Sequence, residues 1–371
     1  PLTDDRKVFD DPNSPFARRQ RAENDRRFVR QITAADLNMM QDIGSSRELL
    51  DWEKDQDMPV DWSKYSAKTM WSKWRDWLGM GPDEKEAIAL MIQAAEKHME
   101  YEETKNVKAL KSAAELYEKA GKKWPDSVLH EDALFYAGEC RFFTGEYTKA
   151  LYLYSELVSK YTNSVLKRDA THRLYMIGCY WVDCYEAEGV GVNVTDSGKP
   201  RFSSFAGAKK AFEAVFMNDA SEHGLAPDAL FALANAYMRR GQEQGDASFD
   251  SAAKYYRQLY EFYPGCKHAD KSYQLAMLAL HRSYRGPLYD DRPLKQAQDI
   301  ALAAQRSGRG DKQLIAEELQ AVKEEQAKHL WVRGQYYEQQ GRFGSSRNYY
   351  NRLAKEFPES EYSHKSAVRY K

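Results

Sequence analysis

The sequence has little of what several common protein functions require. Its net charge is −1, so no overall positive field would attract nucleic acid. No apolar run approaches the length of about 18 residues that a membrane-spanning helix needs. Phosphate-binding glycine loops and the common zinc-binding spacings are missing as well. We therefore expect no catalytic residues, no metal ion and no cofactor, and a protein that binds other proteins but no nucleic acid.

Cysteine is also scarce, with four residues scattered along the chain. That is too few for a disulfide framework. Cys179 and Cys184 stand five positions apart, so on one helix their side chains would point in different directions. We expect small buried thiols. The chain begins with Pro1 rather than Met, and we expect any signal peptide to have been removed already.

What the sequence does contain is one helical pattern that recurs. A small residue is followed by an apolar or aromatic residue after four positions, by another after three more, and by an aromatic after a further four. These spacings place the residues on one helix face, and repetition indicates a repeated unit. Weaker copies begin at Ala208 and Ala297. The four clearest copies are Ala113, Tyr117, Ala120 and Trp124; Ala150, Tyr154, Leu157 and Tyr161; Ala252, Tyr256, Leu259 and Tyr263; and Ser346, Tyr350, Leu353 and Phe357.

We call the residues of this pattern anchors and the helices that carry them anchor helices. Another helix is expected to precede each anchor helix, so that the two form a pair. In two units the glycines Gly138 and Gly334 would let the two helices approach closely. Gly145 and Gly341 follow in the turn, where positive φ is needed. A small residue, a glycine turn, an alanine, an aromatic and a proline are typical of tetratricopeptide repeats. The sequence thus predicts an all-α tetratricopeptide-repeat solenoid of about five to six helix pairs over residues 82–371.

Residues 1–81 are expected to form an irregular N-terminal extension. Its arginines alternate with acidic residues, which suits either an arm that docks on a partner or a solvated tail. Five of the eight tryptophans lie between Trp52 and Trp77. The segment Ser66–Met80 either caps the first repeat or contacts a membrane surface through its tryptophans.

Three insertions are expected between helices, at residues 186–200, 241–248 and 283–293. We expect the first to be flexible, because it is rich in glycine and other turn residues. Such loops either carry binding or merely bridge helices of unequal length.

The C-terminal part resembles a known family. Phe262-Tyr263-Pro264-Gly265 ends one repeat, Tyr284-Arg285-Gly286-Pro287-Leu288-Tyr289-Asp290-Asp291-Arg292 forms an insertion, and Tyr336-Tyr337 stands in the closing repeat. Over about residues 128–371 this is similar to the BamD-type outer-membrane assembly lipoproteins. The insertion between repeats is the most specific part of the resemblance.

The resemblance implies a scaffold on the periplasmic face of the outer membrane. Its partners would be a β-barrel assembly subunit and unfolded outer-membrane proteins. Family members carry a lipidated cysteine at the mature N-terminus, and Pro1 is not cysteine, so a lipid anchor is not visible in this chain. The alternatives are a tetratricopeptide adaptor in another envelope or multiprotein complex, or an accessory factor of an enzyme.

The concave face of the array is the expected binding surface, lined by the first helix of each pair. Exposed aromatic and methionine side chains beside amides and carboxylates would hold an extended peptide, although packing is the alternative role for each. We expect replacement of Phe135, Phe231 and Trp331 by alanine to weaken partner capture without loss of helicity. The candidate residues are Asp132, Phe135, Glu139, Phe142, Asp228, Phe231, Asn235, Met238, Lys328, Trp331, Gln335 and Glu338.

Overall fold

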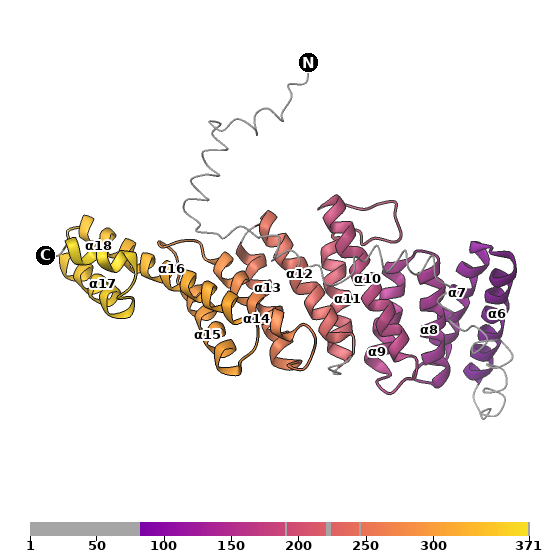
Figure 1. Cartoon of the computed structure of the whole chain (residues 1–371). Coiled ribbons are helices and arrows are strands. Elements are labelled where there is room, and N and C mark those ends of the chain that lie inside the picture. The colour runs from indigo at the N-terminus through magenta and orange to yellow at the C-terminus, as the bar shows by residue number, and fades with distance from the viewer. Residues whose placement is uncertain (1–81, 190, 220–223, 245, 370–371) are drawn as a thin grey trace, which may run out of the picture. The chain divides into compact units, whose positions relative to one another are not determined.

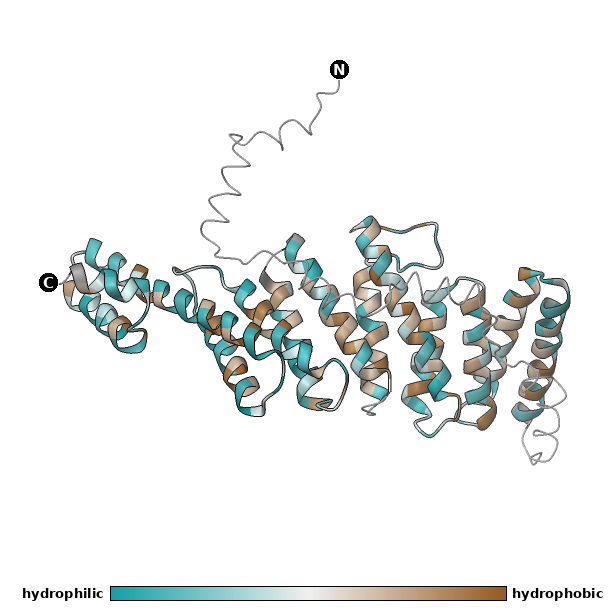
Figure 2. Cartoon of the chain, viewed as in Figure 1, coloured by the Kyte–Doolittle hydropathy of each residue, from teal (hydrophilic) through white to brown (hydrophobic). Residues whose placement is uncertain are grey.

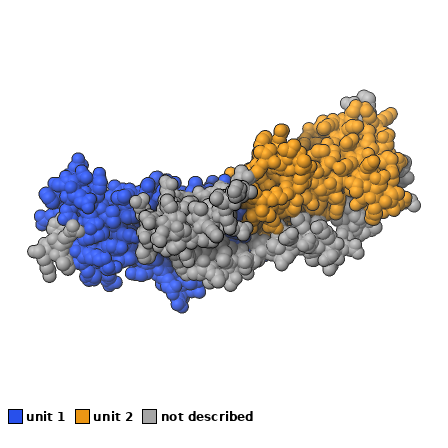
Figure 3. Space-filling view, turned by 90° about the horizontal axis from the view of Figure 1, so that it is seen from above, with its two compact units in different colours: residues 1–40, 233–371 blue, residues 41–232 orange. Residues whose placement is uncertain are grey.

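The computed structural model describes residues 82–189, 191–219, 224–244 and 246–369. In these ranges all regular secondary structure is α-helical, in thirteen helices labelled α6 to α18 (Figure 1). The chain divides into two compact units within α12, after Ala232 (Figure 3). The expected N-terminal extension, residues 1–81, and its tryptophan-rich segment lie outside the described residues.

The N-terminal unit, up to Ala232, is built from three helix pairs and the first part of α12. Each helix carries both hydrophobic and hydrophilic residues, as expected for helices that pack on their neighbours and also face solvent (Figure 2). The bounds are α6 (Pro82–Thr104), α7 (Val107–Lys123), α8 (Val128–Phe143), α9 (Tyr147–Lys160), α10 (Lys167–Glu188), α11 (Ser204–Asn218) and α12 (Ala226–Gln244).

The C-terminal unit is built from the second part of α12 and the helices α13 to α18. Its long helix α16 packs against both α15 and α17. Between α16 and α17, Ala327, Leu330, Tyr350 and Leu353 form a small core. The bounds are α13 (Asp246–Phe262), α14 (Ala269–Ser283), α15 (Arg292–Ser307), α16 (Lys312–Gln339), α17 (Phe343–Glu356) and α18 (Glu361–Arg369).

The first residue of each predicted pattern lies on the second helix of a pair, and all six of these residues are fully or almost fully buried. The aromatic residue that ends each of the four clearest copies directly follows that helix. The six pairs from α6–α7 to α16–α17 agree with the predicted number, so the all-α repeat fold is confirmed. These anchors are Ala113 on α7, Ala150 on α9, Ala208 on α11, Ala252 on α13, Ala297 on α15 and Ser346 on α17.

The predicted roles of the glycines are also confirmed. A Cβ atom added to Gly138 would stand 2.6 Å from a ring carbon of Tyr154, and one added to Gly334 would stand 2.5 Å from a ring carbon of Tyr350. The anchor tyrosine therefore packs directly on the backbone of the preceding helix. Gly145 and Gly341 adopt φ of +73° and +70° in the turns.

Replacing Gly138 by alanine should therefore destabilise the chain. The added methyl group would push the buried Tyr154 ring aside, and such overpacking costs about 1–3 kcal/mol. Gly344→Ala on α17 is the matched control, because a Cβ atom there meets nothing within 4 Å. Since alanine favours a helix over glycine, the control should be neutral or slightly stabilised. Urea unfolding followed by circular dichroism would measure both, and equal stabilities would contradict the expected contact.

Two expectations about the insertions are corrected. Residues 241–248 form no long loop, because α12 continues to Gln244 and α13 begins at Asp246. The Phe249 ring packs against Gly241, where a Cβ atom would stand 2.6 Å from it. The first loop begins only after α10 ends at Glu188 and carries several internal hydrogen bonds. Of the cysteines, Cys140, Cys179 and Cys184 are buried free thiols as expected, whereas Cys266 is half-buried.

Candidate functional site

The predicted binding residues lie on the first helices α8, α12 and α16, but the apolar ones on α8 and α12 are not exposed. Phe135 is 2% exposed and Phe231 is 0% exposed, and Phe142 and Met238 are buried too. The expectation of exposed side chains at these positions is wrong, because each first helix is packed on more than one neighbour. Phe135, for example, contacts the Tyr154 ring edge-on at 6.3 Å. Whether these residues also bind a partner stays a prediction.

The remaining candidates are distributed between the surface and the core. Trp331 packs on Tyr350 with ring centroids 5.2 Å apart and keeps part of its surface exposed. Glu139 and Asn235 are buried. The half-buried candidates are Asp132, Asp228, Lys328, Trp331, Gln335 and Glu338.

Three polar candidates share a structural contact that sequence reasoning missed. Each accepts a hydrogen bond from the anchor tyrosine of its own pair. The hydroxyl of Tyr154 donates to Oε1 of Glu139 at 2.5 Å, and that of Tyr256 donates to Oδ1 of Asn235 at 2.6 Å. Tyr350 donates to Oε2 of Glu338 at 3.0 Å. The signal was available, since a buried tyrosine hydroxyl usually has a hydrogen-bond partner.

Glu139 also links two successive pairs through a buried ion pair with Arg173 of α10. The guanidinium Nε and Nη2 donate to Oε1 and Oε2 of the carboxylate, both at 3.0 Å. The guanidinium carbon lies 4.7 Å from the centroid of the Phe142 ring and 5.2 Å from that of Phe143. Burial raises the pKa of the Glu139 carboxyl to about 8 and lowers that of Arg173 to about 10. The bidentate contact and the tyrosine hydroxyl both favour the ionised carboxylate.

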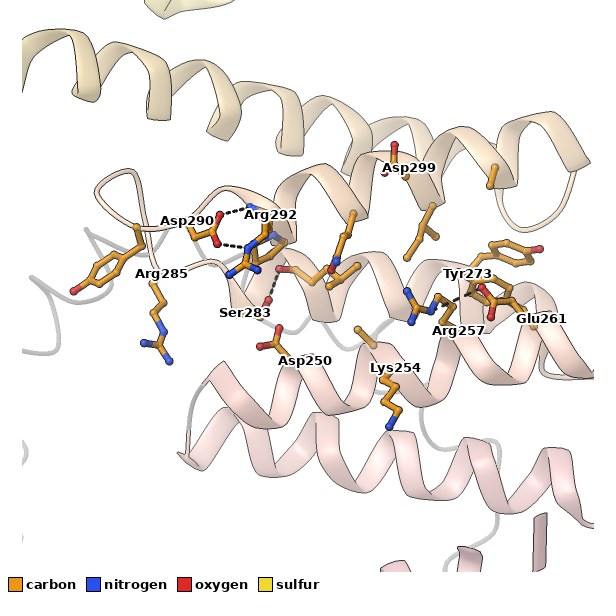
Figure 4. A pocket seen from close by; sticks show the side chains of 18 residues that line it. Asp250, Lys254, Arg257, Glu261, Tyr273, Ser283, Arg285, Asp290, Arg292 and Asp299 are labelled. Atoms are coloured by element: carbon orange, nitrogen blue, oxygen red, sulfur yellow. Dashed lines mark hydrogen bonds and ion pairs between the residues drawn. The ribbon is translucent and has the colours of Figure 1, made fainter. Parts of the chain in front are cut away.

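A groove with a volume of about 850 Å³ lies in the C-terminal unit, between α13, α14 and α15 (Figure 4). Its apolar lining includes Leu280, Ile300 and the Tyr260 ring, which stacks on Tyr273 with centroids 3.9 Å apart. Stacked aromatic and aliphatic side chains provide contact area for an apolar ligand or side chain.

The groove is lined by charges of both signs. Arg257 pairs with Glu261 at 3.8 Å, and the Arg292 side chain pairs with Asp290. Figure 4 shows Asp290 and Arg292 at one end of the groove and Arg257 and Glu261 at the other. The cationic lining residues are Lys254, Arg257, Arg285 and Arg292, and the anionic ones are Asp250, Glu261, Asp290 and Asp299.

The insertion of residues 283–293 forms one end of this groove. Arg285, Tyr289 and Asp290 belong to its lining. The insertion is attached to α16, because Arg333 donates a hydrogen bond from Nη2 to the carbonyl oxygen of Leu288 at 3.3 Å. The insertion, which is the most specific part of the family resemblance, thus contributes to a surface where a partner could bind. The groove itself was missed, since the charges of α13 look like an ordinary solvated face in the sequence.

The groove offers binding chemistry. Cationic and anionic side chains can form ion pairs and hydrogen bonds with a polypeptide, while the tyrosines can pack against its apolar side chains. Among the residues that the structure describes, no cluster of three or more histidine, cysteine or acidic side chains is arranged to hold a metal ion. In the same ranges, no helix combines the length and the apolarity that crossing a bilayer requires.

Comparison with known proteins identifies the repeats. A family model described as "Tetratricopeptide repeat" matches residues 132–164 and 330–360. The first match covers most of α8 and α9, and the second covers the end of α16 and all of α17. The chain therefore contains tetratricopeptide repeats, which are modules of protein–protein interaction. No curated protein matches the chain.

Proposed function

We propose that this tetratricopeptide-repeat chain is a non-catalytic scaffold that acts on the periplasmic face of the outer membrane in the assembly of β-barrel proteins. The observation that carries the proposal is the groove between α13 and α15. One end of it is formed by the Tyr284–Arg292 insertion, the segment that resembles the BamD-type lipoproteins most specifically. Its partners are the β-barrel assembly subunit and unfolded outer-membrane proteins. In this proposal the protein is attached to the membrane through a lipid anchor.

The lining indicates how the groove would bind a polypeptide. Exposed ion pairs contribute only about 0–1 kcal/mol each, so the charges mainly select the partner and its register. The larger part of the affinity comes from apolar side chains that cover Tyr260, Tyr273 and Ile300. A partner segment that carries both acidic and basic residues and a few apolar side chains fits this lining best.

The proposal is tested by crosslinking in cells that express the full chain. A photoreactive amino acid at Gln296, an exposed residue in the groove lining, reports what contacts the groove. The same amino acid at the exposed Glu115 of α7 is the control. We expect a β-barrel assembly subunit to be crosslinked from position 296 and not from 115. Crosslinks to another envelope complex would favour the alternative adaptor role, and crosslinks to cytosolic proteins alone would overturn the proposal.

A charge reversal in the groove should weaken the complex. The double variant Lys254→Glu and Arg257→Glu removes two cations of the lining, both on exposed positions of α13. We expect the affinity for the crosslinked partner to fall about tenfold, in the range that charge reversals at interfaces produce. Lys119→Glu, an exposed position on α7, is the matched control and should bind normally. Binding measured by calorimetry with the purified partner decides, and equal affinities would place the partner elsewhere.

A further inference from the structure

The groove of the C-terminal unit has helical walls of equal length. α13 and α15 form its two sides, and α14 lies between them (Figure 4). The lining runs from Asp250 to Glu261 on α13 and from Arg292 to Ala303 on α15, eleven positions in each case. At about 1.5 Å per residue, each wall is about 16 Å long. This is the length of about three turns of an α-helix.

The walls are unsuited to an extended ligand. An added strand gains its affinity from main-chain hydrogen bonds to a sheet edge, and the described residues include no strand. The backbone groups of α13, α14 and α15 bond within their own helices instead. An extended segment over an apolar lining would therefore leave its own N–H and C=O groups without partners, which is costly. A helix satisfies these groups internally, so the groove favours a helical occupant.

The deep part of the groove is apolar, whereas its rim is charged. Leu280 and Ile300 are 6% and 8% exposed, so they lie deep in the lining. The stacked rings of Tyr260 and Tyr273 belong to the same lining. Helices that bind in grooves insert apolar residues spaced by three and four positions. An amphipathic helix therefore matches both the depth and the rim of this groove.

The charges on the rim of α13 follow a regular pattern. Asp250, Lys254, Arg257 and Glu261 are exposed and stand at spacings of four, three and four. Positions with these spacings lie on one face of a helix. A partner helix along α13 can therefore pair with all four if it carries basic, acidic, acidic and basic residues at the same spacings. The pattern reads alike in both directions, so it suits a parallel or an antiparallel partner.

The other charges of the groove agree with a protein partner. The exposed ion pair of Arg257 with Glu261, at 3.8 Å, is weak enough to be exchanged for contacts with a partner. On the facing wall, Arg292 pairs with Asp290, and Asp299 adds a further acidic group. The lining has four cationic and four anionic residues, so it has no net charge. An anionic lipid surface attracts polybasic segments, and this lining is not one.

We propose that the groove binds an amphipathic α-helix of about three turns from a protein partner. Its apolar face lies toward Leu280 and Ile300, and its basic, acidic, acidic and basic residues pair with the rim of α13. This inference rests on the proposed function, because it names the kind of segment that the same groove binds. It differs from the extended peptide that the sequence led us to expect on the first helices.

The experiment begins with the photoreactive amino acid at Gln296 of the full chain, an exposed residue of the groove lining. The crosslinked segment of the partner is mapped and synthesised as a peptide, and its affinity for the full chain is measured by calorimetry. Proline is then placed at a central position of the peptide where alanine is neutral. We expect the affinity to fall about a hundredfold, because proline strongly disfavours a helix interior.

The matched control is the same peptide with proline at the first position of the helix, where proline is tolerated. This peptide should bind like the original one. Equal affinities of the two proline peptides would show that the bound segment is not helical and would overturn the inference.

Charge reversals then measure the conformation of the bound peptide directly. Asp250→Lys and Glu261→Lys lie at the two ends of the α13 rim, about 16 Å apart by the rise of a helix. Each should weaken binding about two- to tenfold, and reversal of one basic residue of the peptide to glutamate should restore it. The two restoring residues should stand about eleven positions apart in a helix, but only about five apart in an extended segment, which rises about 3.3 Å per residue.

A spacing near five, or the absence of any restoring residue, would contradict the helical occupant. Glu115→Lys, at an exposed position of α7, is the control and should bind normally. Circular dichroism should show unchanged helicity for all three variants of the chain.

The inference and the proposed function fail in different ways. A helical segment from a protein outside β-barrel assembly would support the helical occupant and contradict the proposed function. An extended segment of a β-barrel assembly subunit would do the reverse. If position 296 crosslinked no protein, or phospholipid alone, both would be wrong.

Discussion

Replacing Arg173 by methionine should lower the free energy of unfolding by about 3–5 kcal/mol, the usual cost of breaking a buried ion pair from one side. The variant leaves the carboxylate of Glu139, which is only 1% exposed, without the cation that contacts both of its oxygens. The carboxylate would keep the hydrogen bond from the hydroxyl of Tyr154. The loss should be measured by urea unfolding, followed by circular dichroism.

The controls lie on the same helices. Arg168→Met on α10 removes an exposed arginine and should change the stability by less than about 0.5 kcal/mol. Combining Arg173→Met with Glu139→Gln removes the buried charge and keeps an oxygen that accepts the Tyr154 hydrogen bond. This double variant should recover most of the lost stability, because a buried ion pair can be replaced by neutral groups at little cost. If Arg173→Met and Arg168→Met were equally stable, the ion pair would contribute nothing.

The same variant should become more sensitive to pH. Burial raises the folded-state pKa of Glu139 to about 8, while an unfolded glutamate titrates near about 4.3. A raised folded-state pKa means that the stability is fully present below the unfolded pKa and is lost as pH rises through the folded one. Without Arg173 to stabilise the ionised form, the penalty should therefore be smallest near pH 4 and grow toward pH 8.

Replacing Phe231 by alanine should cost about 3–5 kcal/mol and reduce helicity, as for other fully buried phenylalanines. The sequence alone led us to expect unchanged helicity for this substitution. The structure changes that expectation because the Phe231 side chain is 0% exposed, so its removal leaves a cavity. Thermal unfolding monitored by circular dichroism would measure the difference.

Trp331→Ala provides the comparison among the same candidate residues. Trp331 packs on Tyr350 but remains half-buried, so its loss should cost less stability than the loss of Phe231. A decrease in partner capture by folded Trp331→Ala would support a binding role for the α16 candidates. If Phe231→Ala retained full helicity and stability, the packing account of α12 would be wrong.

The residues that pattern reasoning placed correctly are those whose environment is set by neighbours in sequence. Ala150, Tyr154 and Leu157 lie on one face of α9 because a helix places positions four and three apart on the same side. Gly138 and Gly145 have the predicted close approach and positive φ because both depend on the turn that joins α8 to α9. The same local reasoning could not decide whether a residue on a first helix faces a partner or the core.

By itself, the sequence determined that this protein is made of helix pairs, where their anchors lie, and that they form tetratricopeptide repeats, since all of this follows from the period of a helix and from glycine and proline at its ends. Only the tertiary structure decided which first-helix residues are buried. Glu139 meets Arg173 across 34 positions of sequence, and the groove needs α13, α14, α15 and the insertion together. The physical reason is that burial and electrostatics depend on groups brought together by packing between repeats, which no local spacing encodes.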